Sequence, residues 1–295
     1  MTASAAFPID LSADERMDDG LIDRLRGEVR TLVVAVMGDR IAVSAGELAY
    51  ASPADIGSAW WAFLGRAPSG AGVLLAVLRD SDAAAPAGEW SAFRDAAAGM
   101  TQAEVELGTS AVALGRWLAD ASFCPGCGSA TEQRMAGWAR GCAACGREHF
   151  PRTDPAVIVA VMSEDRQRLL LGANAMWQGK MFSCFAGFVE AGESAESAIH
   201  RELFEEAGVR VRDVRYIESQ AWPYPRSLML GYHATVVDDD AVRPDGEEII
   251  QARWFTRDEI RRGLAGELDV RIPGGISVAH RLIRAWFDEM EESAL

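Results

Sequence analysis

Lysine is almost absent from this chain of 295 residues, in which Lys180 is the single example. The 29 Lys+Arg residues are outnumbered by 44 Asp+Glu residues, and the formal net charge is −15. Such a field repels polyanions, so the composition excludes generic coating of nucleic acids. Wherever the chain binds phosphate, it must use arginine, backbone amides or a divalent cation held by carboxylates.

Targeting signals are also missing from the first twenty residues, which have neither a basic start nor an apolar run of signal length. We therefore expect a cytoplasmic protein that is neither secreted nor inserted into a membrane. The five cysteines agree with a reducing compartment, because four form two Cys-x-x-Cys pairs and only Cys184 stands alone. A secreted disulfide framework has a different pattern.

The paired cysteines are Cys124 with Cys127 and Cys142 with Cys145, separated by fourteen residues. Each pair can form a tight turn that directs two sulfur atoms at one ion, and four thiolates fill a tetrahedral Zn²⁺ shell without space for water. The spacing predicts a structural zinc ribbon that stabilises a segment too short for its own core. A pair of redox dithiols is the alternative, which the glycine after each pair makes less favourable.

Composition changes divide the chain into three parts. Strand-like apolar runs, interrupted by Pro, Gly, Ser and Asp, predict a small α+β domain over residues 1–120, with a helix from Trp90 to about Phe123. The zinc ribbon occupies residues 121–150, and alternating strands and helices predict an α/β sandwich-like domain over residues 151–295. The predicted strands are 31–37, 73–78, 156–162, 168–172, 211–218, 227–237 and 253–255. A final helix is predicted over about 277–290, with its core face formed by Val278, Leu282, Ile283, Trp286, Phe287 and Met290.

The strongest chemical signal lies between Gly187 and Val209. A glycine-containing loop reaches Glu193, and a helix is expected to begin at Ser194 and to end at the glycine before Val209. Three of its glutamates, Glu202, Glu205 and Glu206, share one helix face. Because like charges at this spacing repel, they indicate a cation, and an all-oxygen shell favours Mg²⁺ or Mn²⁺. Arg201 beside them can orient a carboxylate or hold a phosphate, and a solvated acidic face is the alternative for the whole cluster.

This stretch resembles the signature of the Nudix hydrolases, G-x5-E-x7-R-E-U-x-E-E-x-G-U with U aliphatic, at every fixed position. The resemblance implies an α/β fold in which a Nudix α/β/α sandwich domain follows a zinc ribbon and a small α+β N-terminal domain. It also implies hydrolysis of a nucleoside diphosphate linked to another group. Glu202, Glu205 and Glu206 would hold the catalytic Mg²⁺ or Mn²⁺, and Glu205 or Glu206 would accept the proton of the attacking water.

A second stretch is similar to the S-Q-P-W-P-F-P-x-S array of the NADH pyrophosphatases, which are members of that superfamily. It begins at Ser219 and departs from the array at two positions, Ala221 and Tyr224. Two prolines around a Trp and a Tyr make a rigid aromatic surface suited to a substrate or a subunit contact, and a buried turn is the alternative. The resemblance assigns substrate contacts to Gln220, Ala221, Trp222, Pro223, Tyr224, Pro225, Arg226 and Ser227.

The same family implies further site residues. Phe150, Ala186 and Phe188 match positions that line its dinucleotide pocket, Ala279 matches a backbone contact to substrate, and Arg94 loosely matches a substrate-binding arginine. Glu248 matches an additional metal carboxylate, with Glu247 as an ambiguous neighbour. The family is homodimeric. An ordinary core position is the alternative for Phe188.

These features predict a metal-dependent enzyme that hydrolyses the pyrophosphate of NADH, and also of NAD⁺, to AMP and nicotinamide mononucleotide. The same chemistry on the NAD cap of an RNA 5′ end is the alternative. A non-catalytic binding module would require the loss of Glu205 or Glu206. His200, His233 and His280 are read as structural histidines, His149 as a residue not needed by the zinc site, and Cys184 as a small packing residue.

Overall fold

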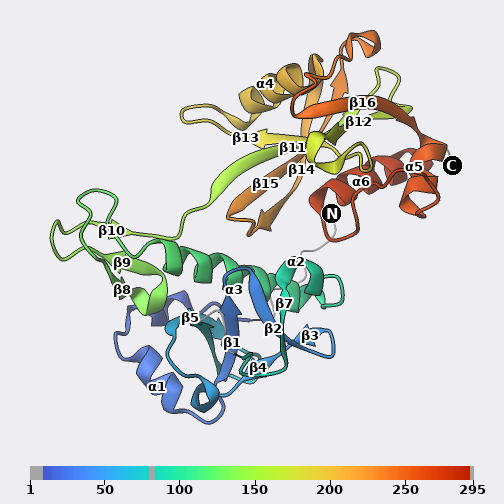
Figure 1. Ribbon diagram of the computed structural model, residues 1–295. Helices are drawn as coiled ribbons and strands as arrows, with labels where there is room; N and C mark the ends of the chain where they lie inside the picture. The colour runs from blue at the N-terminus through green and yellow to red at the C-terminus, as the bar shows by residue number, and fades with distance from the viewer. Residues whose placement is uncertain (1–8, 80–83, 293–295) are drawn as a thin grey trace. The chain divides into compact units, whose positions relative to one another are not determined.

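A computed structural model describes residues 9–79 and 84–292, the last three by their backbone alone (Figure 1). The chain divides into two compact units: residues 1–152 with Pro223–Arg226, and residues 153–222 with 227–295. No helix in these described ranges is both long and apolar enough to cross a membrane.

The first unit is built on one mixed sheet with helices on both faces. Its strand order is β3-β2-β1-β6-β5, with β4 paired to β1 and β7 to β2, and β1 runs parallel to β6. The helix α1 (Leu21–Gly27) packs with Val33 and Phe63 on one face, whereas Gly115 of α3 (Gln102–Asp120) lies directly on Val36 on the other. The strands are β1 (Leu32–Met37), β2 (Arg40–Ser44), β3 (Glu47–Leu48), β4 (Tyr50–Ala51), β5 (Trp60–Arg66), β6 (Gly72–Val77) and β7 (Glu89–Ala92). The unit is thus a helix–sheet–helix sandwich.

The helix expected from Trp90 to about Phe123 is wrong at its start. Trp90 lies in β7, where it pairs with Ala42 of β2. A short helix α2 (Phe93–Ala96) follows, and α3 begins only after Thr101, whose hydroxyl forms a capping box with Glu104. The Ala-rich composition favours helix locally, but the edge of the sheet takes up Trp90, and a tertiary partner of this kind overrides helix propensity.

The ribbon segment forms a small antiparallel sheet in the order β10-β9-β8, with β8 (Glu132–Arg134), β9 (Ala139–Gly141) and β10 (Glu148–His149). Arg140 is buried and donates hydrogen bonds to the carbonyls of Thr131 and Leu118 and to the Thr131 hydroxyl. The Trp138 indole N–H donates to the carbonyl of Phe63 in β5 at 2.6 Å. These bonds attach the ribbon to the sheet and to α3, in the same compact unit.

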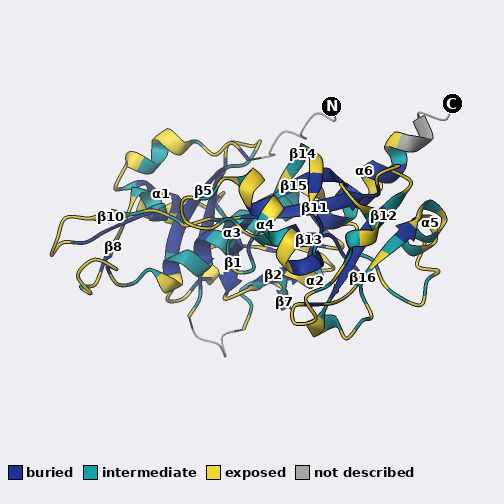
Figure 2. Cartoon of the chain, turned by 90° about the horizontal axis from the view of Figure 1, so that it is seen from above, coloured by how far each residue is buried: buried dark blue, intermediate teal, exposed yellow. Residues whose placement is uncertain are grey.

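The second unit is the α/β/α sandwich expected from the sequence. Its strands follow the order β14-β15-β11-β12-β16, with β13 paired to β11 and β11 parallel to β15. The buried strand β11 (Asp154–Met162) alternates along its length: Val157, Val159 and Val161 face α4 (Ala195–Ala207), and Ile158, Ala160 and Met162 face α6 (Val278–Glu292). Figure 2 shows β11 in the dark blue of buried residues. Two apolar cores therefore lie on opposite faces of one sheet.

The remaining elements of this unit are β12 (Arg168–Asn174), β13 (Phe185–Phe188), β14 (Val211–Trp222), β15 (Ser227–Val236), β16 (Ile249–Thr256) and α5 (Arg257–Leu264). All the strands predicted here are present, but β14 and β16 extend beyond their predicted ends. The predicted core face of α6 is buried from Val278 to Phe287, and the side chain of Met290 lies outside the described residues. The imidazole of His233 is fully buried and bonded to the carbonyl of Leu282, which confirms its structural role.

Candidate active site and zinc-ribbon cluster

The helix α4 presents the glutamates, and its ends follow the sequence signals. The Ser194 hydroxyl accepts a hydrogen bond from the Ser197 N–H at 3.1 Å, so Ser194 is the N-cap. At the other end, Gly208 adopts a φ of 69°, a left-handed conformation that favours glycine. Its N–H donates to the carbonyl of Phe204, which closes the last turn. The glutamates therefore lie on a helix with both ends satisfied.

Arg201 is the centre of a charged network on this helix. Its Nε and Nη2 donate to both oxygens of Glu193 at 2.9 and 2.8 Å, and its Nη1 donates to Glu202 at 2.8 Å and to Glu205 at 3.2 Å. Nη2 also donates to the carbonyl of Phe188 at 2.9 Å. These bonds, first those to Glu193, raise the pKa of Arg201. All three nitrogens are engaged, so the arginine orients carboxylates and ties the glycine loop to the helix.

The strand β13 brings the loop against the carboxylates. A Cβ atom at Gly187 would overlap the Glu202 carboxylate, so only glycine permits this approach. Ala186 pairs with Ile158 and is half-buried, whereas the Phe188 side chain is 55% exposed. The alternative considered for Phe188, an ordinary core position, is wrong. An exposed aromatic ring next to a carboxylate cluster is available to a ligand.

Glu206 is the most unusual carboxylate of the site. It is 5% exposed, and its Oε2 is buried without a hydrogen-bond partner among the described residues. Burial, followed by the charges of Glu248 and Glu202, raises the pKa of Glu206 to about 8. A buried carboxylate without a donor is unfavourable unless a cation completes it. The residues present therefore fit a divalent cation with oxygen ligands.

Glu248 comes from the other side of the site. It lies just before β16. Among the neighbouring charges that raise the pKa of Glu206, that of Glu248 has the largest effect. Its backbone carbonyl accepts from the Ala175 N–H at 2.8 Å, and its Oε1 accepts from the Asn174 amide at 3.4 Å. The structure thus brings Glu248 into electrostatic reach of the α4 glutamates, 42 residues away from Glu206 in sequence.

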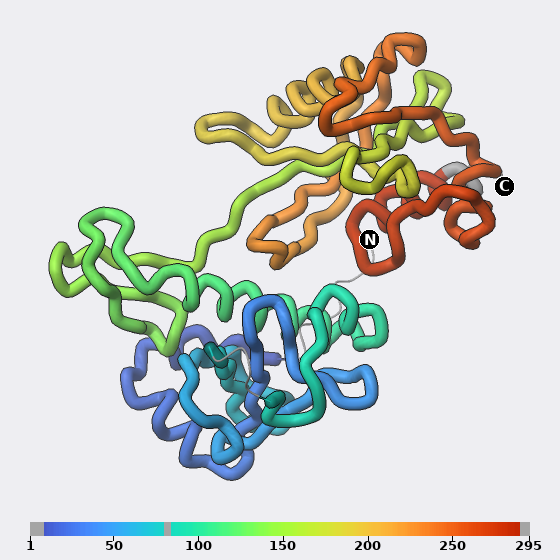
Figure 3. Tube along the Cα trace, viewed as in Figure 1, coloured from blue at the N-terminus to red at the C-terminus, as the bar shows by residue number. Residues whose placement is uncertain are grey.

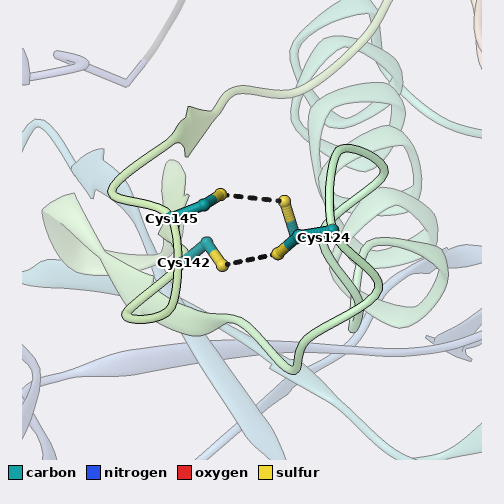
Figure 4. A group of neighbouring side chains, drawn as sticks. Cys124, Cys142 and Cys145 are labelled. Carbon is teal, nitrogen blue, oxygen red and sulfur yellow. Dashed lines mark hydrogen bonds between the residues drawn. The ribbon is translucent and has the colours of Figure 1, made fainter.

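The ribbon cysteines form a closed cluster. Their four sulfur atoms lie within 4.8 Å of one another, with 3.7 Å between Cys124 and Cys145 and 3.5 Å between Cys127 and Cys142 (Figure 4). Zn–S bonds of about 2.3 Å in a tetrahedron require sulfur separations of about 3.8 Å. The two Cys-x-x-Cys turns share one backbone hydrogen bond. The Gly128 N–H donates to the Cys124 carbonyl, and the Gly146 N–H donates to the Cys142 carbonyl.

Two further candidate ligand residues stay outside this cluster. His149 is not a member, in line with a shell of four cysteines. Cys184 is buried in the second unit, with its thiol directed at the Ala279 carbonyl, and burial raises the pKa of Cys184 to about 12. A thiol of this kind is inert packing, as the sequence predicts.

The Ser219–Ser227 array is divided by the structure. Residues up to Trp222 belong to β14, so the predicted turn is confined to the four residues between β14 and β15. The Gln220 side chain donates to the Ile276 carbonyl at 2.8 Å and accepts from the Val278 N–H at 2.7 Å, which fixes the start of α6. Ala221 is exposed, Trp222 is half-buried and Ser227 is buried. Pro223, Tyr224, Pro225 and Arg226 group with the first unit, and burial raises the pKa of Tyr224 to about 12.

The other predicted substrate contacts are distributed over both units. Phe150, which is 56% exposed, and Arg94, exposed on α2, belong to the first unit. Ala279 is buried at the start of α6 in the second unit. The carboxylates of the candidate cation site all belong to the second unit.

Three residues of the site were not predicted from the sequence. Glu193 was expected only to open the helix, but it holds Arg201 through both oxygens. Asn174 and Asp245 contact the residue Glu248 or its backbone. A signal existed for Glu193, because it is a fixed position of the signature, whereas nothing local marks Asn174 or Asp245.

Comparison with known proteins gives the relationships of the chain. The NUDIX domain family matches residues 152–272, and the NADH pyrophosphatase zinc ribbon domain matches residues 119–150. The chain is 40% identical over 274 residues to the "NAD-capped RNA hydrolase NudC" of Mycobacterium tuberculosis (strain H37Rv), covering 89% of this chain and 85% of that protein. It is 38% identical over 211 residues to the protein of the same name in Chromobacterium violaceum, covering 72% and 75%. Among solved structures, a Nudix hydrolase of Nitrosomonas europaea aligns with a TM-score of 0.45 and 26% identity, over 58% of this chain and 93% of that one.

Proposed function

Because this chain belongs to the Nudix hydrolases, in the NudC family that carries the NADH pyrophosphatase zinc ribbon, we propose that it hydrolyses the pyrophosphate of NADH and NAD⁺. The products are AMP and nicotinamide mononucleotide, reduced when NADH is the substrate. The reaction requires Mg²⁺ or Mn²⁺ at the α4 carboxylates, and the ribbon holds a structural Zn²⁺ through Cys124, Cys127, Cys142 and Cys145.

One observation carries the proposal: the buried Glu206 oxygen without a partner, surrounded by further carboxylates. We assign the ligand set of the catalytic cation to Glu202, Glu205, Glu206 and Glu248. Such a set attracts hard divalent cations. Because it repels an anionic substrate, a bound cation must mediate substrate binding. With a single lysine in the chain, a metal is the natural route to phosphate.

The mechanism follows from these side chains. When bound, the divalent cation lowers the pKa of a water molecule and offsets charge on the phosphate oxygens. Arg201 holds Glu202 and Glu205 in place against Glu193, so the carboxylates need little reorganisation on substrate binding. Either Glu205 or Glu206 accepts the proton of the attacking water.

Substrate contacts are proposed from the same family relationship. Phe188 stacks on a base from its exposed position beside the carboxylates. Further substrate contacts are proposed for Phe150, Ala186, Ala279, Arg94 and residues 220–227. We propose a homodimer in the cytoplasm. The proposed domains are an N-terminal α+β domain over 1–120, the zinc ribbon over 121–150 and the Nudix domain over 151–295.

Removal of the NAD cap from RNA is the second candidate. It uses the same pyrophosphate chemistry, and the relatives from M. tuberculosis and C. violaceum bear this activity in their names. The net charge of −15 opposes long contacts with an RNA body but says little about a few nucleotides that enter a pocket.

A substrate competition tests both candidates. The purified protein, with Mg²⁺ or Mn²⁺, receives equal amounts of NADH, NAD⁺, ADP-ribose and a short NAD-capped RNA, and chromatography follows the products. Faster release of AMP from NADH supports the dinucleotide pyrophosphatase, whereas preferential decapping assigns the enzyme to RNA turnover. Absence of any metal-dependent cleavage would refute both.

A further inference from the structure

The segment that joins β15 to β16 is attached to the C-terminal end of α4 by two backbone hydrogen bonds. The Arg243 N–H donates to the Ala207 carbonyl at 2.7 Å, and the Asp245 N–H donates to the Glu206 carbonyl at 3.2 Å. Carbonyls in the last turn of a helix have no partner within the helix, so these bonds satisfy groups that are otherwise open. Figure 3 traces this orange segment past the end of α4. The loop is therefore attached at the residue that carries the buried carboxylate.

The side chain of Asp245 then organises the rest of the loop. Its Oδ1 accepts hydrogen bonds from the backbone N–H groups of Glu247 at 3.0 Å, Glu248 at 3.2 Å and Ile249 at 2.9 Å. Three convergent donors on one carboxylate oxygen fix the backbone of this turn. One residue thus connects the end of α4 with the backbone of Glu248.

The opposite side of Glu248 is held from β12. The Ala175 N–H donates to the Glu248 carbonyl, and the Asn174 amide reaches its carboxylate. Because Glu248 itself is exposed, its carboxylate owes its place to these neighbours rather than to burial in a core. A cation site that uses an exposed ligand needs such support.

On this geometry, we propose that Asp245 is a positioning residue that holds Glu248 opposite Glu206, so that both carboxylates bind one divalent cation. The inference rests on the proposed function only for the identity of the cation site. Asp245 positions Glu248 through an acceptor oxygen, and its charge adds separately to the negative field at Glu206. An asparagine, whose side-chain oxygen is also an acceptor, therefore substitutes for it, and an alanine does not.

The test compares Asp245→Ala with Asp245→Asn in the full chain. Asp165→Ala is the matched control, because Asp165 also accepts a backbone N–H, that of Gln167 at 2.9 Å, but in the β11–β12 turn away from the carboxylates. Binding of Mn²⁺ is measured by electron paramagnetic resonance without substrate, and the dependence of kcat and KM on Mn²⁺ is measured on NADH. Thermal unfolding without added Mn²⁺ shows that each variant folds.

We expect Asp245→Ala to raise the Mn²⁺ dissociation constant by about 10–100-fold. Asp245→Asn raises it by about two- to fivefold, and Asp165→Ala leaves it unchanged. Saturating Mn²⁺ restores much of kcat in the alanine variant. Unchanged Mn²⁺ affinity in Asp245→Ala overturns the inference, and so does an asparagine variant as impaired as the alanine variant, since that identifies the charge as the cause.

Failure of the proposed function gives a different result. If the unmodified protein binds Mn²⁺ but cleaves no dinucleotide or capped RNA, the function is wrong, and the binding series still decides the role of Asp245. If the protein cleaves NADH and Asp245→Ala binds Mn²⁺ normally, the positioning inference alone is wrong.

Discussion

The ribbon cysteines and the α4 glutamates are both clusters of side chains that can bind a metal, but their potential ligand atoms are arranged differently. Among the residues that the structure describes, the four cysteines are the one group of three or more potential ligands whose ligand atoms already gather closely, with all four sulfurs within 4.8 Å of one another. The carboxylates have different surroundings: Glu202 and Glu205 bond to Arg201, the buried Oε2 of Glu206 has no hydrogen-bond partner, and Glu248 stands on a separate loop.

The difference follows from charge. Thiols are neutral until a metal displaces their protons, so the backbone of the two Cys-x-x-Cys turns can converge them into a closed tetrahedron. Carboxylates repel one another at neutral pH. In the metal-free chain, the hydrogen bonds of Arg201 and the burial of Glu206 offset this repulsion. A closed shell suits a permanent structural ion. An open set, whose fourth member comes from a separate loop, suits a metal that also binds substrate.

The largest expected effect is a loss of activity, which distinguishes the α4 glutamates from the ribbon cysteines. Glu206→Gln removes a charged oxygen from the cation site, and we expect kcat for NADH to fall by about 10²–10⁴-fold. The zinc content stays at about one ion per chain. Steady-state kinetics and elemental analysis measure the two quantities.

Glu196→Gln is the control for this variant, because Glu196 is exposed on the first turn of the same helix. It keeps the activity of the unmodified protein. Near-normal turnover in Glu206→Gln would contradict the assignment of the α4 site as the catalytic centre.

A second experiment breaks the ribbon and leaves the carboxylates intact. Cys142→Ser removes one of four thiolates, so we expect loss of the zinc ion and a fall in thermal stability of the first unit. Binding of Mn²⁺ by the second unit stays within about twofold, a change smaller than 1 kcal/mol. Elemental analysis and calorimetry give these values. Cys184→Ala is the matched control and keeps its zinc; zinc retained by Cys142→Ser would disprove the closed four-cysteine shell.

The smallest expected effect concerns the pH dependence of stability. Since the pKa of Glu206 rises from its ordinary 4.5 to about 8 on folding, the folded metal-free chain holds a proton that the unfolded chain releases. The free energy of unfolding therefore decreases as the pH rises from about 4.5 through 8.

Glu206→Gln removes this loss, because glutamine does not ionise. In buffer without Mg²⁺ or Mn²⁺, we expect its Tm to exceed that of the unmodified protein more at pH 8 than at pH 5, by about 2–4 °C per kcal/mol. Scanning calorimetry at both pH values measures the difference. An equal difference at both would show that Glu206 is already ionised in the folded chain at pH 5.

Local patterns account for most of what was predictable. The two Cys-x-x-Cys pairs, the helix from Ser194 to Gly208 and the apolar strand predicted over 156–162 depend on residue spacing and local composition, so they could be predicted directly. Trp90 could not be assigned, since its strand exists only through pairing with β2. The roles of Asn174 and Asp245 could not be predicted, because hydrogen bonds to an exposed loop produce no periodic pattern in the sequence.

The sequence by itself determined the chemistry available to this protein: four thiols at zinc-binding spacing, three glutamates on one helix face, and a charge balance that requires a cation at phosphate. Those properties depend on residue type and on distances along the chain. Only the tertiary structure decided which acid is buried without a donor, which carboxylates bond to Arg201, and how Glu248 comes within electrostatic reach of α4 from the loop before β16. These depend on packing between segments far apart in sequence, where burial and neighbouring charges set the state of each group.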